Sequence, residues 1–312
     1  MQRVRLWLRL WLLTCLACQA FPALAHLVSV VSSDQTAAFQ EASDSLVQAL
    51  LRSGVARADI HLLSIADYLE GGPHVMEARL IVTLGTDALR HVVVRNSRTP
   101  VIAGLVPRLS YERVLQESGK KNPSTMAALY LDQPFGRQLD LLRLALPAVR
   151  HIGVLWGPES ITQQALLNTA LQGRGLELSE GTYTEGQSLI AALRTAMSDA
   201  EVLLAVADGA VYNPASVSNI LLTSYRAKTP VLAFSPAYVK AGALLSVHST
   251  AAQAGAQLGA MSAHLLQTNS MPANQYPAEF SISANEYVAR SLGLSLDVGA
   301  LSERLRKLEK KP

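Results

Sequence analysis

The chain has 312 residues, which is enough for one large α/β domain or for two lobes of about 100–150 residues each. Hydrophobic residues make up 49% of the chain and charged residues 16%, a composition too apolar for a disordered protein. The formal net charge of +3 is far below that of a protein that binds nucleic acid through a clustered basic face. We therefore expect a folded protein with no nucleic-acid partner.

The first 25 residues have the three parts of a secretory signal peptide. Three arginines precede an apolar run of about nine residues, and Ala23-Leu24-Ala25 supplies a small-residue cleavage site. The run is about half as long as the roughly 20 residues that a membrane-spanning helix needs. We expect export to the periplasm with cleavage after Ala25.

Cys18 offers a less favoured alternative, in which the chain is a lipoprotein acylated at that residue. Cys15 stands where a lipobox normally has leucine, which argues against it. Removal of residues 1–25 would take away three arginines, both cysteines and no acidic residue, and would leave 24 basic and 24 acidic side chains. We expect no disulfide in the remaining chain, and no membrane span because no later stretch has 18 uninterrupted apolar residues.

Short β-branched or apolar runs alternate with helical patterns after residue 25. In the first half, strands are expected at 26–31, 60–63, 80–84 and 99–103, and helices at 36–52 and 85–94. A loop at 119–124, rich in Gly, Lys, Asn, Pro and Ser, precedes a second round of the alternation. There, strands are expected at 127–131, 151–155, 176–183, 201–205, 230–234, 243–247 and 278–282, and helices at 135–146, 161–172, 215–228, 250–267 and 285–291. This alternation predicts two parallel sheets covered by helices, and residues 302–311 are expected to form a solvated, fraying helix.

The sequence contains no recognisable catalytic or metal-binding motif. It has no G-x-S-x-G turn and no glycine-rich phosphate loop, and its seven histidines lack the spacing that directs two of them onto one metal. We expect neither enzymatic activity nor a cofactor or metal. An enzyme that uses Asp132, Asp208 and His248 is a weaker alternative, because the sequence shows no base and orienting partner.

Polar residues follow the expected strands at the sheet edge where open α/β folds bind ligands. The candidate ligand-binding residues share this position: Ser32, Ser33, Gly85, Thr86, Val106, Asp132, Trp156, Gly157, Asp208, Phe234, Ser235 and His248. Backbone N–H groups near Ser33 and Thr86 would hold a carboxylate or another anion, and Trp156 or Phe234 would stack on an apolar part. Simpler roles compete with these, since Ser and Thr are good helix caps and tryptophan is mostly buried.

Three stretches carry a resemblance to a known family: LIVTLGTDALRHVVVRNSRTPVIAGLVPR at 80–108, LPAVRHIGVLWGPES at 146–160, and TPVLAFSPAYVKAGALLSVHSTAAQAGAQLG at 229–259. Through them, residues 26–292 resemble the type I periplasmic solute-binding proteins. The closer resemblance is to the ABC-transporter substrate-binding family, which includes tryptophan- and tyrosine-binding members.

The resemblance implies two Rossmann-like lobes with parallel sheets, joined by a three-segment hinge. The N-terminal lobe would comprise 26–124 and 250–275, and the C-terminal lobe 125–249 and 276–312. The implied function is that of a monomeric component of an ABC importer. It would close on a small amino-acid-like or aromatic ligand and deliver it to a permease in the inner membrane.

The sequence departs from the family pattern at two strand ends. Gly209 follows Asp208 where the family often has asparagine, and Gly157 precedes proline where asparagine is common. Both changes remove polar contacts. A larger and more apolar ligand, or a ligand-sensing or degenerate binding protein that signals to a membrane partner, is therefore the alternative.

Overall fold

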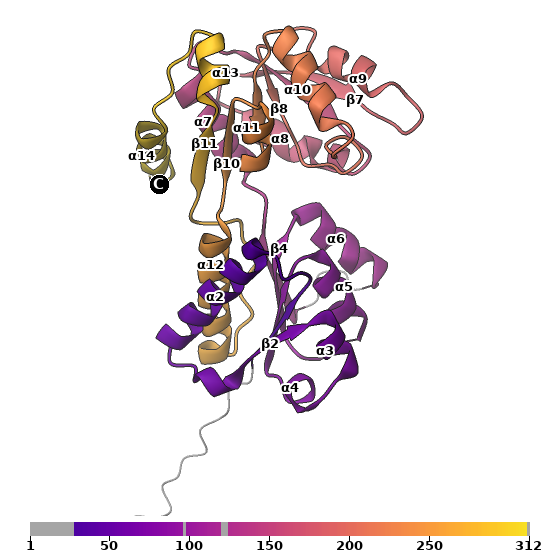
Figure 1. The fold of residues 1–312 in the computed structure, drawn as a ribbon, viewed down its shortest axis with the longest axis vertical. Helices are drawn as coiled ribbons and strands as arrows, with labels where there is room; N and C mark the ends of the chain where they lie inside the picture. The colour runs from indigo at the N-terminus through magenta and orange to yellow at the C-terminus, as the bar shows by residue number, and fades with distance from the viewer. Residues whose placement is uncertain (1–27, 96–97, 120–123, 311–312) are drawn as a thin grey trace, which may run out of the picture.

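The computed structural model describes residues 28–95, 98–119 and 124–310 and places them in two α/β lobes stacked end to end (Figure 1). The expected signal peptide, Cys18, the start of the first strand and most of the 119–124 loop lie outside the described residues. Within the described part of the chain, no helix is long and apolar enough to cross a membrane. The expected fold class, two α/β lobes with mainly parallel sheets, is confirmed.

The first lobe is built on a five-stranded parallel sheet in the order β2-β1-β3-β4-β5. Its strands are β1 (Val28–Ser32), β2 (Ile60–Ser64), β3 (Leu80–Leu84), β4 (Val101–Val106) and β5 (Met126–Tyr130). One face is covered by α2 (Ala37–Arg52) and α12 (Ala251–Thr268), and the other by α3 (Ile65–Glu70), α4 (Pro73–Met76), α5 (Thr86–Arg95) and α6 (Arg108–Glu117). A short 3-10 turn, η1 (Arg57–Asp59), leads into β2. Because helices cover both faces, most strand residues are buried and apolar.

The second lobe contains a six-stranded sheet in the order β11-β10-β9-β8-β6-β7, in which only β11 runs antiparallel to its neighbour. Its strands are β6 (His151–Trp156), β7 (Glu177–Thr182), β8 (Val202–Leu204), β9 (Val231–Ala233), β10 (Leu245–His248) and β11 (Ser281–Ala284). One face packs against α7 (Phe135–Ala145), α8 (Gln164–Leu171), α13 (Glu286–Ser291) and α14 (Val298–Glu309), and the other against α9 (Leu189–Ala196), α10 (Val217–Arg226) and α11 (Pro236–Ala241). The 3-10 turn η2 (Ser160–Gln163) follows β6.

Strand β5 belongs to the first sheet, so the expected start of the second lobe at residue 125 is too early. It pairs in parallel with β4, from Val101 opposite Met126 to Val106 opposite Tyr130. The first crossover therefore comes after residue 130. The loop composition at 119–124 did not mark a lobe boundary, because a loop that joins two strands of one sheet has the same composition as one that joins two lobes.

Helix α12 returns to the first lobe and packs closely against α2. A Cβ on Gly255 would overlap the carbonyl group of Ala42, and one on Gly259 would overlap the side chain of Ala49. These two glycines are four residues apart and therefore lie on one face of α12. Their lack of side chains lets the two helix backbones approach, which fixes the second crossover beside the first lobe.

Helix α14 is not the solvated, fraying helix that the sequence indicated. It begins at Val298, and Leu301 and Leu305 are buried in the same core cluster as α7 (Phe135–Ala145). The leucines recur at helical spacing and lie on one face, so the segment is amphipathic. The charged residues between them made it look like a solvated helix.

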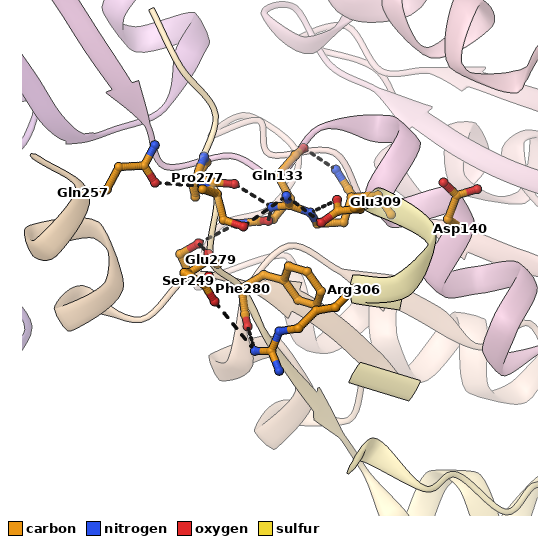
Figure 2. A network of polar contacts seen from close by, with 12 residues as sticks. Gln133, Asp140, Ser249, Gln257, Pro277, Glu279, Phe280, Arg306 and Glu309 are labelled. Carbon is orange, nitrogen blue, oxygen red and sulfur yellow. Dashed lines mark hydrogen bonds and ion pairs between the residues drawn. The ribbon is translucent and has the colours of Figure 1, made fainter. Parts of the chain in front are cut away.

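Three crossovers connect the lobes, at residues 131–134, 249–250 and 276–280. Figure 2 shows the polar network that joins them. The side chain of Gln133, in the first crossover, donates to Ser249 Oγ in the second at 2.9 Å. Ser249 in turn donates to the carbonyl of Glu279 in the third. All three segments are thus hydrogen-bonded to one another at the hinge.

Candidate ligand-binding site

A narrow crevice lies at the base of the cleft between the lobes, beside the hinge. Its walls come from both lobes and from the first and third crossovers: Arg108, Asp132, Gln133, Phe135, Gln138, Gln163, Ala205, Val206, Ala207, Phe234, Val247 and Tyr276. Four of these residues, Ala205, Val206, Ala207 and Phe234, follow the carboxyl ends of β8 and β9, which is the edge where this class of sheet binds ligands. We call this place the interlobe crevice.

Arg108 is the cation of the crevice and begins helix α6. Its Nη1 donates to the hydroxyl of Tyr276 at 3.0 Å, its Nε donates to Glu112 at 2.7 Å, and its guanidinium lies 5.8 Å from the ring centre of Tyr130. Burial opposes the charge, but the hydrogen bonds to Glu112 and Tyr276 hold the pKa of Arg108 above its ordinary value. The side chain is thus a fixed, permanently charged donor at the edge of the crevice.

Asp132 is the acid of the crevice, directly after β5. One carboxylate oxygen accepts the backbone N–H of Arg108 at 2.6 Å and so caps the start of α6. Burial raises the pKa of this carboxyl, while the hydrogen bond from Arg108 acts in the opposite direction. Asp132 therefore fixes the position of Arg108 and also lines the crevice.

Phe234 forms the aromatic wall on the second lobe. Its ring centre lies 5.7 Å from that of Tyr212, nearly perpendicular, and 4.7 Å from that of Tyr238. The hydroxyl of Tyr238 donates to the carbonyl of Tyr212 at 3.1 Å, which fixes the cluster. With Phe135 and Tyr276 as further ring-bearing walls, the crevice combines apolar surface with a few polar groups, as ligand sites generally do.

The amide of Gln133 links the crevice to the hinge. Its oxygen accepts from Arg137 Nη1 at 2.6 Å, and the same guanidinium donates to the carbonyl of Pro277 at 2.7 Å. Arg137 also pairs with Glu309 at the end of α14 and lies 4.7 Å from the ring centre of Phe280. One buried arginine therefore contacts both the first and the third segment that connect the lobes.

The lobes are also bridged directly at the side of the cleft. Arg113 on α6 forms an ion pair with Glu159, which lies between β6 and η2 in the second lobe. The two side chains are 41% and 43% exposed. This contact joins α6 of the first lobe directly to the β6–η2 loop of the second.

Of the residues expected at the site, the structure brings Asp132 and Phe234 to the interlobe crevice. The expectation that Trp156 stacks on a ligand is wrong. Its side chain is fully buried in the core of the second lobe, and its indole N–H donates to Glu180 at 2.6 Å. Trp156 lies at the end of a strand, as the candidate ligand-binding residues were expected to, but its side chain points into the core on one face of the sheet.

Gly157 and Asp208 have a structural role. The carboxylate of Asp208 is buried and accepts the backbone N–H groups of Glu159, Ser160 and Ala210. A Cβ on Gly157 would overlap that carboxylate. Asp208 therefore joins the loop after β8 to the loop after β6, and Gly157 leaves room for it.

Ser32, Ser33, Gly85 and Thr86 lie away from the interlobe crevice. Two of the N–H groups near Ser33 and Thr86 are in use, because the backbone N–H of Ser33 donates to the carbonyl of Leu84 and that of Ala88 donates to the hydroxyl of Ser33. Gly85 adopts a positive φ of 91° and approaches Ser33 so closely that a Cβ would overlap its hydroxyl.

Ser32 and Ser33 instead line a groove between α2 and α3. Three carboxylates, those of Asp34, Asp44 and Asp67, also line this groove. They would repel an anion, so the expected anion site near Ser33 is not supported.

Val106, Ser235 and His248 make no described contact with the crevice. Val106 is fully buried in the first lobe, Ser235 precedes α11 as its N-cap, and His248 Nδ1 lies 3.3 Å from Ser246 Oγ at the end of β10. Burial lowers the pKa of His248.

Sequence reasoning missed most of the polar lining of the crevice, namely Arg108, Gln138, Gln163 and Tyr276. Gln133 was visible next to Asp132 as a polar residue after a strand. Tyr276 gave no signal, because it reaches the crevice from a crossover remote in sequence. Across the described ranges, no three His, Cys, Asp or Glu side chains come together as a metal-binding group.

Comparison with known proteins gives a consistent result. The family model of the ABC transporter substrate binding protein matches residues 74–300, more than half of the chain. Comparison with curated protein sequences gives no match.

Several solved structures are similar. A ligand-free, open substrate binding protein with adhesive properties from Clostridium difficile has a TM-score of 0.69 and 17% identity, covering 87% of this chain and 96% of that one. A conserved domain protein from Vibrio cholerae has a TM-score of 0.59 and 18% identity, and the match covers 89% of this chain and 97% of that one. The ABC domain from Streptococcus pneumonia in complex with L-Trp has a TM-score of 0.57 and 16% identity, and the match covers 88% of this chain and 98% of that one.

At these identities the solved structures establish the fold, and the family model establishes the family that the sequence resembled. The chain belongs to the ABC transporter substrate binding protein family and has the two-lobed fold of type I periplasmic binding proteins.

Proposed function

We propose that the chain is the exported solute-binding component of an ABC importer, which holds a small organic ligand in the interlobe crevice and closes around it. The observation that carries this proposal is the composition of the crevice, which takes residues from both lobes and from the hinge. A ligand there gains its full set of contacts only when the lobes are together. It would therefore shift the population toward the closed state.

The crevice favours a ligand with an anionic group beside a flat apolar part. Arg108 offers a charged guanidinium, and Phe135, Phe234 and Tyr276 offer ring surfaces. Guanidinium groups bind carboxylates well because their donors match the carboxylate oxygens. Amino-acid-like and aromatic carboxylates fit this chemistry, and L-Trp, the ligand in the Streptococcus pneumonia structure, is a suitable first probe.

The remaining parts of the proposal concern location and partners. The signal-peptide pattern of residues 1–25 supports export to the periplasm, and the family supports delivery to an ABC permease in the inner membrane. Reversible closure requires no chemical step, so we propose a binding protein rather than an enzyme. We further propose that it acts as a monomer, because the crevice is complete within one chain.

The direct test is thermal unfolding of residues 26–312 with a panel of L-amino acids, aromatic carboxylates and monosaccharides. A ligand at about 100 times its Kd stabilises the native state by roughly 2.7 kcal/mol, which raises Tm by several degrees. Arg108→Met should abolish the shift, while Arg90→Met, at an exposed site on α5, should leave it unchanged. No shift with any compound would overturn the proposal.

Tryptophan fluorescence is a poor substitute for this assay. Trp156 is the single tryptophan in 26–312, but it is buried and bonded to Glu180, away from the crevice. Calorimetry is therefore the better second method.

A further inference from the structure

In the side-chain amide of Gln138, the NH2 group has a hydrogen-bond partner and the oxygen has none among the described residues. Gln138 lies on α7 and lines the interlobe crevice with 7% of its surface exposed. Its Nε2 donates to the backbone carbonyl of Gln133 at 2.8 Å. Its Oε1 is buried and has no hydrogen-bond partner among the described residues.

The orientation of this amide is determined by its neighbour. The carbonyl of Gln133 can only accept a hydrogen bond, so the NH2 group of Gln138 must face it. A flipped amide would bring two acceptor oxygens together and lose the bond. The oxygen of Gln138 is therefore fixed on the side of the amide opposite Gln133, in a residue that lines the crevice.

Buried carbonyl oxygens are rarely left unpaired in folded proteins, and each exception calls for an explanation. Neighbouring residues do not supply one here. Arg137, the next residue, directs its donors to Gln133, Pro277 and Glu309. Arg108, also in the crevice wall, directs donors to Glu112 and Tyr276.

We infer that the oxygen of Gln138 accepts a hydrogen bond from an N–H or O–H group of the ligand and makes the site select ligands that carry such a donor. The inference rests on the proposed function, because it needs a ligand in this crevice. A ligand with an ammonium or hydroxyl group near its apolar part would satisfy the oxygen on closure. A ligand without that group would leave it unpaired and would bind more weakly.

The inference is tested with pairs of compounds that differ by one donor group. Suitable pairs are L-tryptophan and indole-3-propionate, L-phenylalanine and 3-phenylpropionate, and 4-hydroxyphenylacetate and phenylacetate. For at least one pair, the wild-type protein should bind the donor-bearing member about 10- to 100-fold more tightly by calorimetry. Because the ratio compares the affinities of two compounds for the same protein, a general loss of affinity in a variant cancels out of it.

Two variants separate the acceptor from the structural contact. Gln138→Met removes both the oxygen and the NH2 group of the amide. The ratio of the affinities for the two members of a pair should then fall to near one. Gln138→Glu retains acceptor oxygens but loses the N–H donated to Gln133, and should keep a preference for the donor-bearing member. If the methionine variant does not fold, the wild-type and glutamate ratios still decide the question.

The outcomes distinguish this inference from the proposed function. Equal binding of both members of every pair by the wild-type protein overturns the role of Gln138 while the proposed function stands; an ordered water as the partner of Gln138 would give this result. A ratio that falls equally in both variants also overturns it, because the amide would then act only through Gln133. Absence of binding by every compound, in this set and in the panel above, overturns the proposed function itself.

Discussion

Arg113 and Glu159 form an ion pair that joins α6 of the first lobe to the loop after β6 of the second. Arg108, on the same helix as Arg113, and Gln163, in the turn that follows Glu159, both line the interlobe crevice. We propose that this charge contact favours the closed arrangement of the lobes together with the ligand.

Glu159→Gln should weaken ligand binding about 2- to 5-fold, because pairs as exposed as this one contribute up to about 1 kcal/mol. The loss should shrink as salt rises, since exposed charges are screened. Calorimetry at low and high salt measures both effects. Asp87→Asn, which breaks the exposed pair of Asp87 with Arg90 on α5, is the matched control and should leave affinity unchanged. Equal affinities of Glu159→Gln and the wild type at low salt would contradict this role.

The hinge network predicts a large effect on stability for Arg137. Its removal in Arg137→Ala leaves Glu309 without its cation and the carbonyl of Pro277 without its donor, in a nearly buried setting. We expect a loss of about 2–4 kcal/mol in the free energy of unfolding. Urea unfolding measures it.

Arg304→Ala on α14 is the control for Arg137→Ala, because Arg304 is exposed. It should change stability by less than about 0.5 kcal/mol. A similarly small effect of Arg137→Ala would show that the hinge is held by packing alone.

The close approach of α12 and α2 predicts that Gly255→Ala is destabilising. The added Cβ would overlap the backbone carbonyl of Ala42, so one helix has to shift. Overpacking of this kind costs about 1–3 kcal/mol. Gly209→Ala adds the same methyl group where no atom lies within 4 Å, and should be nearly neutral. Thermal unfolding of the two variants compares them, and equal Tm values would refute the packing argument.

Asp132 predicts a pH dependence of stability. Burial raises the pKa of its carboxyl above the ordinary value of 3.8, so the folded chain holds this proton to a higher pH than the unfolded chain does. Its contribution to stability therefore falls as pH rises from about 3.8 through the raised pKa, and is constant above it.

Asp132→Asn removes this titration while its side-chain oxygen can still accept from the backbone of Arg108. Relative to wild type, the variant should gain stability between acidic and neutral pH. Urea unfolding across pH 4–8 measures the difference between the two curves, and parallel curves would show that Asp132 does not titrate in this way.

The fold was largely predictable from the sequence, because strands buried on both faces appear as short apolar runs. Every expected strand is present to within a few residues. Helix α6 was missed since its first turn follows Pro107 and its polar face dominates the local pattern. Helices α9 and α11 were also missed, although α8 and α13, which have the same lengths of eight and six residues, were predicted.

The binding site was predictable only in part. The strand-end rule located Asp132 and Phe234, but it gave no information about the face of the sheet to which a side chain points. Trp156 therefore was assigned to the ligand although it packs in the core. Gln138 and Tyr276 reach the crevice from a helix interior and from a distant crossover, and their convergence depends on tertiary structure.

We propose that a ligand bound in the interlobe crevice closes the two lobes. Residues 26–312 contain no cysteine, so spin labels can be placed at Gln116→Cys on α6 and Ala165→Cys on α8, two exposed positions on opposite lobes. Double electron–electron resonance then measures the distance between them with and without the compound that raises Tm most. We predict a shorter and narrower distance distribution with the compound, and no such change when Arg108→Met is added. An unchanged distribution at saturating, calorimetrically verified ligand would contradict the account.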